Sequence, residues 1–257
     1  MRQIKLGMVI AKPETRTISE IEKYITSEEV EMLMFPEGYL QSGNLEKVRE
    51  LARKHKKWIV SGMDDDRVLS HGMETGIIID PSGDIAGEHR KTSLTKWEVE
   101  HGCQRGNSIK VIETPLGKFG FAICYEIHFP EVSRILALQD AEIIFNPIGS
   151  GMWNEAQFNV WNAIARARAS ENSAFVVGCS HFDDCIPVAF AYAPGGECLA
   201  SSREQNRMVP VVLDFGKYKT EKDFDQRRPE LYSDLVGLKY LGNQSTKDQW
   251  RIARRKP

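Results

Sequence analysis

Residues 120–126, Gly-Phe-Ala-Ile-Cys-Tyr-Glu, form the most informative stretch of the chain, because four apolar or small residues lead into a cysteine and a polar pair leads out. This pattern predicts a buried strand that ends at Cys124 and a sharp turn into a helix. Pro130 and Glu131 suit the first turn of that helix, where a missing N–H costs nothing and a carboxylate complements the positive helix end. The turn presents a thiol at a strand end, although a free cysteine also packs as an inert small hydrophobe.

Two other strand-like runs lead to charged residues. Glu37 closes the run Met-Leu-Met-Phe-Pro-Glu-Gly at 32–38, and Lys91 follows a predicted hairpin that turns at 80–84. A carboxylate at the end of a buried strand is partly desolvated, which raises its pKa and makes it a better proton acceptor near neutrality. Two other interpretations remain open at this point: Glu37 caps a loop, and the basic cluster around Lys91 is a solvated face.

Strands and helices alternate along the chain with little linker between them. The runs at 32–35, 143–145 and 175–177 are apolar on both faces, which is typical of strands inside a covered sheet. Repeated strand–helix–strand units predict an α/β fold with helices packed outside sheets. We expect one domain over residues 1–257, with a polar C-terminal arm that starts at about residue 217.

The composition excludes several classes of protein. The chain has 257 residues, of which 41% are hydrophobic, and a formal net charge of −2, so it lacks the basic excess of a nucleic-acid binder. No stretch approaches the roughly 18 apolar residues of a membrane span. The five cysteines show no paired metal-ligand spacing and no apolar signal precedes them, which favours a cytoplasmic protein with reduced thiols and no bound metal.

The motifs around these residues occur together in an order that resembles the nitrilase superfamily of carbon–nitrogen hydrolases, with an amidase-like or carbamoylase-like member as the nearest type. The resemblance covers nearly the whole chain. It implies a four-layer α-β-β-α sandwich, no cofactor, a homodimer or higher homo-oligomer, and a catalytic set of Glu37, Lys91 and Cys124. The motifs are Phe-Pro-Glu at 35–37, His-Arg-Lys at 89–91, Ile-Cys-Tyr-Glu at 123–126 with Phe-Pro-Glu at 129–131, Arg-Ala-Arg-Ala-Ser-Glu-Asn at 166–172, and Arg-Arg-Pro-Glu-Leu-Tyr at 227–232.

The catalytic set supplies what amide hydrolysis needs, which is a strong nucleophile, a proton shuttle and positive charge at the oxyanion. We expect Cys124 to form a thioester while Glu37 moves protons. Lys91 lowers the pKa of the thiol in this scheme and stabilises the oxyanion. The resemblance adds the backbone N–H of Tyr125 as a second oxyanion donor.

The resemblance also implies a second glutamate downstream of the lysine. Glu98 and Glu100 both flank the expected place, and Glu98 is favoured because it follows Trp97. An exposed, salt-bridging glutamate is the other interpretation of Glu98. Trp153 is a candidate wall of the substrate pocket, with a core tryptophan as the alternative.

The predicted function is hydrolysis of a non-peptide C–N bond in a small amide or N-carbamoyl compound. Ile127 and His128 stand where related hydrolases of N-carbamoyl D-amino acids carry two arginines, which argues against a substrate α-carboxylate held there. Two alternatives stay open: a nitrilase that converts a nitrile to acid and ammonia, and a catalytically idle binding or scaffold protein of the same fold. No histidine lies in a segment that resembles a Cys-His protease signature.

Overall fold

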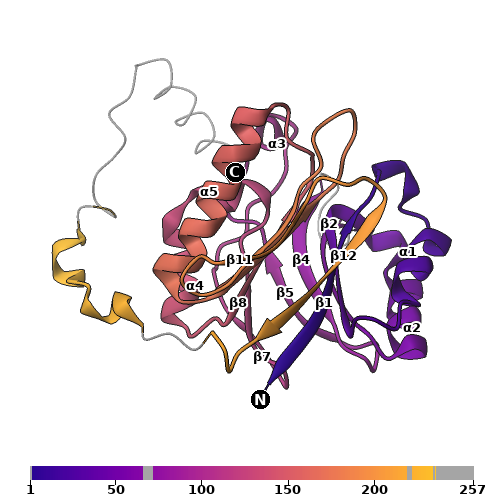
Figure 1. Ribbon diagram of the computed structural model, residues 1–257. Coiled ribbons are helices and arrows are strands. Elements are labelled where there is room, and N and C mark those ends of the chain that lie inside the picture. The colour runs from indigo at the N-terminus through magenta and orange to yellow at the C-terminus, as the bar shows by residue number, and fades with distance from the viewer. Residues whose placement is uncertain (1, 66–71, 219–221, 234, 236–257) are drawn as a thin grey trace. The chain divides into compact units, whose positions relative to one another are not determined.

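The structure is a computed structural model that describes residues 2–65, 72–218, 222–233 and 235 (Figure 1). The chain divides into two units, Met1–Lys222 and Asp223–Pro257. The described part of the second unit contains two short 3₁₀ helices, at Asp223–Gln226 and Pro229–Leu231. The single domain over 1–257 stays a prediction, and much of the arm expected from about residue 217 lies outside the described residues.

Within the described residues, the first unit is built on two six-stranded mixed sheets. The first sheet has the order β12-β1-β2-β3-β4-β5 and the second has the order β11-β10-β9-β8-β7-β6. The strands β1, β2 and β3 are parallel, as are β7, β8 and β9, and the other neighbours in each sheet are antiparallel.

The strands of the first sheet are β1 (Gln3–Ile10), β2 (Met32–Gln41), β3 (Trp58–Asp65), β4 (Met73–Ile79), β5 (Ile85–Arg90) and β12 (Arg207–Asp214). Those of the second are β6 (Ile112–Thr114), β7 (Gly117–Phe121), β8 (Ile143–Ile148), β9 (Phe175–Ser180), β10 (Ala189–Tyr192) and β11 (Cys198–Ser202). The helices are α1 (Ile18–Ile25), α2 (Leu45–His55), α3 (Lys96–Glu100), α4 (Pro130–Leu138) and α5 (Glu155–Asn172).

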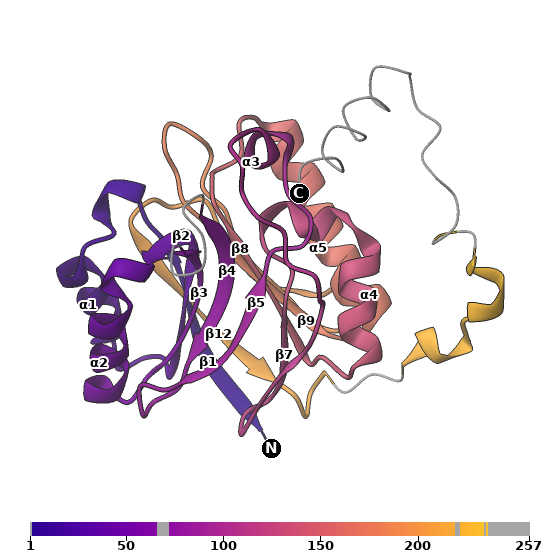
Figure 2. The same ribbon diagram turned by 180° about the vertical axis from the view of Figure 1, so that it is seen from behind.

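The helices form outer layers on the two sheets. Figures 1 and 2 show α1 and α2 over the first sheet and α4 and α5 over the second. One hydrophobic cluster, which includes Met34, Phe121 and Phe145, fills the space between the sheets. Two further clusters lie between each sheet and its helices. The predicted four-layer α-β-β-α sandwich is therefore confirmed.

Local sequence explains why the outer helices form where they do. In α2, Leu45, Val48 and Leu51 recur at helical spacing and are buried against the first sheet. In α5, the side chain of Asn154 accepts a hydrogen bond from the Gln157 backbone N–H, which satisfies one of the free donors at the helix start. Within the described ranges, no helix combines the length and apolar character that crossing a bilayer requires.

The structure differs from the sequence-based expectation near two site residues. The strand β2 does not end at Glu37 but continues to Gln41, with a shift of its pairing to β3 between Phe35 and Leu40. The helix α3 was not predicted, because its five residues are too few to show a helical period. Both features bear on the site, since they hold Glu37 and Glu98.

Candidate active site

Cys124 lies at the junction that the sequence predicts. The strand β7 ends at Phe121, and a 3₁₀ helix at Cys124–His128 leads into α4. Cys124 has a backbone φ of +46°, a left-handed conformation that residues other than glycine rarely adopt. Such strain persists only where the surroundings hold it in place, and it is concentrated at functional sites.

Two buried polar side chains hold this turn. Glu126 accepts a hydrogen bond from the Ile123 backbone N–H at 2.8 Å. Asn146, at the end region of β8, donates from Nδ2 to the carbonyl oxygens of Ala122 and Cys124, the latter at 3.1 Å. The Asn146 Oδ1 in turn accepts from the indole N–H of Trp161 at 3.0 Å. The thiol therefore stands on a backbone that is fixed by hydrogen bonds from both sides.

Glu37 lies in the irregular segment of β2 and faces the second sheet. His181 donates from Nε2 to the Glu37 carbonyl oxygen at 2.7 Å, which fixes the backbone there. Gly149, in the second sheet's loop after β8, allows the carboxyl to approach closely. A Cβ at position 149 would lie 2.6 Å from Glu37 Oε2, so any larger residue there would have to displace this carboxylate.

Lys91 directly follows β5 and its side chain is fully buried. Its Nζ donates to Glu37 Oε1 at 2.7 Å and also contacts Glu98 Oε1. A buried ammonium is stable only with such partners, because taking a charge out of water without one costs several kcal/mol. Lys91 thus links two carboxylates that come from different parts of the chain.

The helix α3 sets the position of Glu98. Thr95 caps the helix: its backbone N–H donates to Glu98 Oε2 at 2.5 Å, and its hydroxyl accepts from the Glu98 N–H at 3.3 Å. Glu100 is exposed and lies 3.6 Å from Lys96. Of the two glutamates that the sequence left open, Glu98 is the one that contacts Lys91.

The charges in the site oppose one another. Burial raises the pKa of Glu37, and the positive charge of Lys91 counteracts this rise. Burial alone lowers the pKa of Lys91, but the charges of Glu37, Cys124 and Glu98 outweigh it and raise that pKa. The ammonium is therefore charged throughout the physiological range.

The pKa of Cys124 is higher than the sequence suggests. Burial raises the pKa of this thiol, and the negative charge of Glu37 raises it further. Lys91 and the backbone N–H of Gly149 act in the opposite direction but do not outweigh burial. Lys91 thus acts on the pKa of the thiol in the expected direction, but burial and the charge of Glu37 outweigh it, so the pKa of the resting thiol is raised.

Supporting residues that the sequence analysis did not single out surround this set. Glu126 accepts hydrogen bonds from the Thr92 backbone N–H and hydroxyl, both at 2.6 Å, and lies 3.1 Å from His89 Nε2. Glu126 and His89 belong to the quoted motifs, so the signal was present. His181 and Asn146 lie outside those motifs, and only the fold shows that they contact the backbone of Glu37 and Cys124.

The two candidate substrate-binding residues, Tyr125 and Trp153, are exposed to different degrees. Tyr125 is 38% exposed, and its ring packs 5.2 Å from the rings of His128 and Phe129. Trp153 is 75% exposed in the segment before α5, so it is not a core tryptophan. The roles of both in binding a substrate stay predictions.

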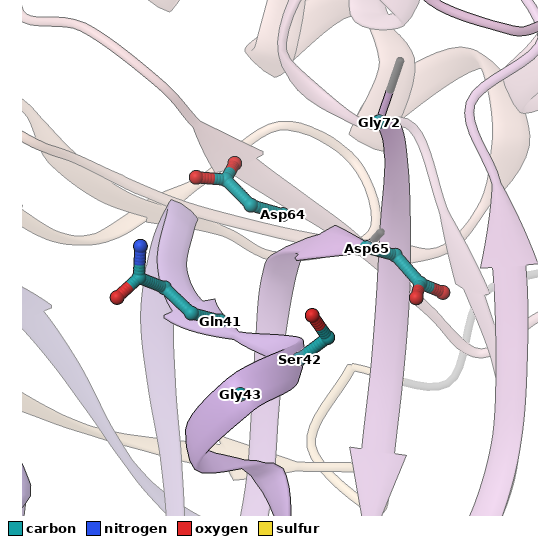
Figure 3. Close-up of a pocket in the computed structure, with 6 residues that line it drawn as sticks. All are labelled: Gln41, Ser42, Gly43, Asp64, Asp65 and Gly72. Carbon is teal, nitrogen blue, oxygen red and sulfur yellow. The ribbon is translucent and has the colours of Figure 1, made fainter. Parts of the chain in front are cut away.

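A cavity of about 280 Å³ opens beside the ends of β2 and β3 (Figure 3). Its lining does not include Glu37, Lys91 or Cys124, and Figure 3 shows the carboxylates of Asp64 and Asp65 pointing in different directions. Among the described residues, no group of three or more His, Cys, Asp or Glu side chains is arranged to hold a metal ion. The residues that line the cavity are Gln41, Ser42, Gly43, Asp64, Asp65 and Gly72.

Comparison with known proteins gives a consistent family. The model of the carbon–nitrogen hydrolase family matches residues 9–215. The chain is 26% identical over 211 residues to the chloroplastic omega-amidase of Arabidopsis thaliana, and the match covers 75% of this chain and 56% of the relative. The chain spans about half to two thirds of the length of the first curated relatives that it matches.

Solved structures show the same fold. A carbon–nitrogen hydrolase from Helicobacter pylori G27 superposes with a TM-score of 0.82 at 20% identity, covering 93% of this chain and all of that one. An amidase from Nesterenkonia sp. AN1, with the acetamide moiety of fluoroacetamide added covalently at its active-site cysteine, superposes with a TM-score of 0.75 at 19% identity. That match covers 91% of this chain and 96% of the amidase.

Proposed function

Since this chain belongs to the carbon–nitrogen hydrolase family, we propose that it hydrolyses a non-peptide C–N bond of a small amide or N-carbamoyl compound. One observation carries the proposal: Lys91 Nζ lies 2.7 Å from Glu37 Oε1, and the charges of both residues act on the Cys124 thiol. A nucleophile, a base and a fixed positive charge thus meet at one point. The relative named an omega-amidase supports an amide as the substrate class.

The first half of the reaction forms a thioester. Glu37 accepts the thiol proton as the Cys124 sulfur attacks the carbonyl carbon, so the thiol, whose pKa is raised in the resting site, loses its proton in the same step as the attack. The carbonyl oxygen gains negative charge, which Lys91 Nζ and the Tyr125 backbone N–H stabilise. The C–N bond then breaks, and Glu37 returns the proton to the leaving ammonia or amine.

The second half releases the acid. A water molecule loses a proton to Glu37 and attacks the thioester carbonyl, through a second oxyanion stabilised by the same donors. The C–S bond breaks, the acid leaves, and the proton on Glu37 restores the thiol. Glu98 stays bound to Lys91 throughout and holds the ammonium in place. Atoms and charges balance without a cofactor.

The test is a cysteine replacement combined with mass spectrometry. We expect the wild-type protein to release ammonia from short amides, and Cys124→Ala to abolish this release while the thermal transition stays close to that of the wild type. Cys198→Ala, which removes an exposed thiol, is the matched control and should keep full activity. An acyl adduct on any other cysteine, or persistent turnover by Cys124→Ala, would contradict the proposal.

The homo-oligomeric state and the cytoplasmic location both stay predictions. Light scattering of the purified chain measures the first directly, and a strictly monomeric mass would exclude it.

A further inference from the structure

Glu74 is a buried carboxyl with no assigned role beside the catalytic lysine. It lies near the start of β4, and its Oε2 is buried without a hydrogen-bond partner among the described residues. Leaving a buried charged group without a partner costs more than an ordinary hydrogen bond contributes, so such groups call for an explanation. The carbonyl oxygen of Glu74 accepts the Lys91 backbone N–H at 2.9 Å, which places Lys91, just after β5, beside Glu74 in β4.

The alternation of β4 sets the direction of this side chain. Ile77 and Ile79 pack in the cluster on the helix side of the sheet, whereas Ile78 packs between the sheets. A Cβ at Gly76 would meet the Phe121 ring of the second sheet at 2.6 Å. Because side chains alternate along a strand, Glu74 shares the inner face with Gly76 and Ile78. This is the face that carries the catalytic set.

More negatively charged than positively charged side chains act on Glu74. The negative charges of Glu37, Asp64 and Glu98 all act on its carboxyl, while Lys91 is the cation that acts on it. Lys91 is already matched by two carboxylates. Burial, reinforced by the like charges, raises the pKa of Glu74 well above its usual value.

The pairing across the sheet adds to this imbalance. Glu74 stands directly opposite Asp64 on β3, and like charges at opposed positions destabilise a sheet. Asp64 has a cationic neighbour, since Arg16 Nη1 lies 3.3 Å from its Oδ2. No ion pair of Glu74 is found within the described part of the chain. A cation bound from solution would reduce the repulsion between Glu74 and Asp64 and would give Glu74 Oε2 the partner that it lacks among the described residues.

We propose that Glu74 selects amide substrates that carry a second, cationic group, a primary ammonium or a guanidinium, and that its free carboxyl oxygen binds that group. This inference rests on the proposed amide hydrolysis. On binding, the cation replaces the proton that the buried carboxyl otherwise holds. A substrate with a terminal carboxylate offers Glu74 no cation and meets repulsion from the negative charges of Asp64 and Glu98 instead.

The experiment compares amides of one shape and different charge. The set is 5-aminopentanamide, pentanamide and the monoamide of glutaric acid, with sets one carbon shorter and one carbon longer. We expect wild-type kcat/KM to be highest for the cationic amide and lowest for the anionic one. In Glu74→Gln the ratio of cationic to neutral kcat/KM should fall about 10- to 100-fold, mainly through KM, as for loss of a charged hydrogen bond. Glu88→Gln, which removes an exposed acid from β5, should leave the ratio unchanged.

A binding measurement separates this inference from the proposed function. Calorimetry on Cys124→Ala should show tighter binding of 5-aminopentanamide than of pentanamide, and Cys124→Ala/Glu74→Gln should lose the difference. Equal binding of the two amides, or a wild-type preference for the anionic amide, overturns the role of Glu74 even if hydrolysis is established. Selective binding of the cationic amide without any Cys124-dependent turnover would support Glu74 and overturn the hydrolase proposal.

Discussion

Replacing Lys91 by methionine tests whether the site is held together by its charges. The substitution keeps an unbranched side chain of similar length and removes only the ammonium between Glu37 and Glu98. Both carboxylates are buried, so each loses its cation without gaining water. Removing one partner from a buried ion pair costs about 3 to 5 kcal/mol, and we expect a loss of this size near neutral pH.

The pH dependence of that loss distinguishes electrostatics from packing. Without Lys91, the pKa of Glu37 rises further, because burial and the negative charge of Glu98 are no longer opposed by the ammonium. A group whose pKa is raised in the folded state contributes stability below its unfolded pKa and loses it as pH rises through the folded pKa. The Glu37 carboxyl therefore adds a slope of about 1.4 kcal/mol per pH unit within that window. Relative to the wild type, Lys91→Met should therefore be most stable near pH 5 and weaken toward pH 8.

Equilibrium urea unfolding, followed by circular dichroism across this pH range, measures the effect. Lys96→Met is the matched control, because Lys96 pairs with Glu100 at 3.6 Å on the surface and should change the free energy of unfolding by less than about 1 kcal/mol. Adding Glu98→Gln to Lys91→Met should recover part of the lost stability and reduce the pH slope. A Lys91→Met protein whose stability runs parallel to that of the wild type at all pH values would refute the electrostatic argument.

Two further predictions concern the carboxylates on either side of the nucleophile. Burial tends to raise the pKa of Glu126, but hydrogen bonds from His89 and Thr92 outweigh burial and lower that pKa. The ionised carboxylate therefore stabilises the fold above the ordinary pKa of a glutamate, and this stabilisation is lost as the pH falls. Glu126→Gln should cost about 2 to 4 kcal/mol in urea unfolding at neutral pH, with a smaller difference in acid, and an equal cost at both would contradict the assignment. Because burial raises the pKa of Glu37, the acid limb of the kcat/KM profile should fall above 4.5, the ordinary value for a glutamate. In a stopped assay across pH, a limb at or below that value would exclude Glu37 as the base.

Much of the layer arrangement could be predicted from the sequence, because strands buried on both faces leave an unmistakable apolar run. The strands β2, β8 and β9 were expected on that ground, and all three are interior strands of their sheets. In α2, Leu45, Val48 and Leu51 recur at helical spacing, so the buried face of this helix can also be read from the sequence. The irregular pairing of β2 around Glu37 could not be predicted, since a register shift depends on the partner strand rather than on local sequence.

Some features of the site could likewise be predicted from the sequence, whereas others are shown only by the structure. The chemistry expected at positions 37, 91 and 124 follows from the residue types, which the sequence shows directly. The choice of Glu98 over Glu100 depends on the structure, in which Thr95 caps α3 and fixes the Glu98 side chain. The lowering effect of Lys91 on the pKa of Cys124 could be predicted from the sequence, but the burial that outweighs this effect could not. Glu74 could not be identified from the sequence, because only the structure shows that its Oε2 is buried without a hydrogen-bond partner among the described residues.

The position of the site between the two sheets explains why these charges are compatible with a stable fold. Glu37 and Lys91 come from the first sheet, and Cys124 comes from the loop after β7 in the second, so the set is complete only when the sheets pack. The burial that raises the pKa of Glu37 and suits it to proton transfer is the same burial that requires Lys91 to have carboxylate partners. Glu37 and Glu98 meet that requirement, and the carboxyl of Glu74 is then in excess of what the fold needs. An excess acid in a buried site raises the energy of the empty protein, and a cationic ligand is the partner that lowers it again.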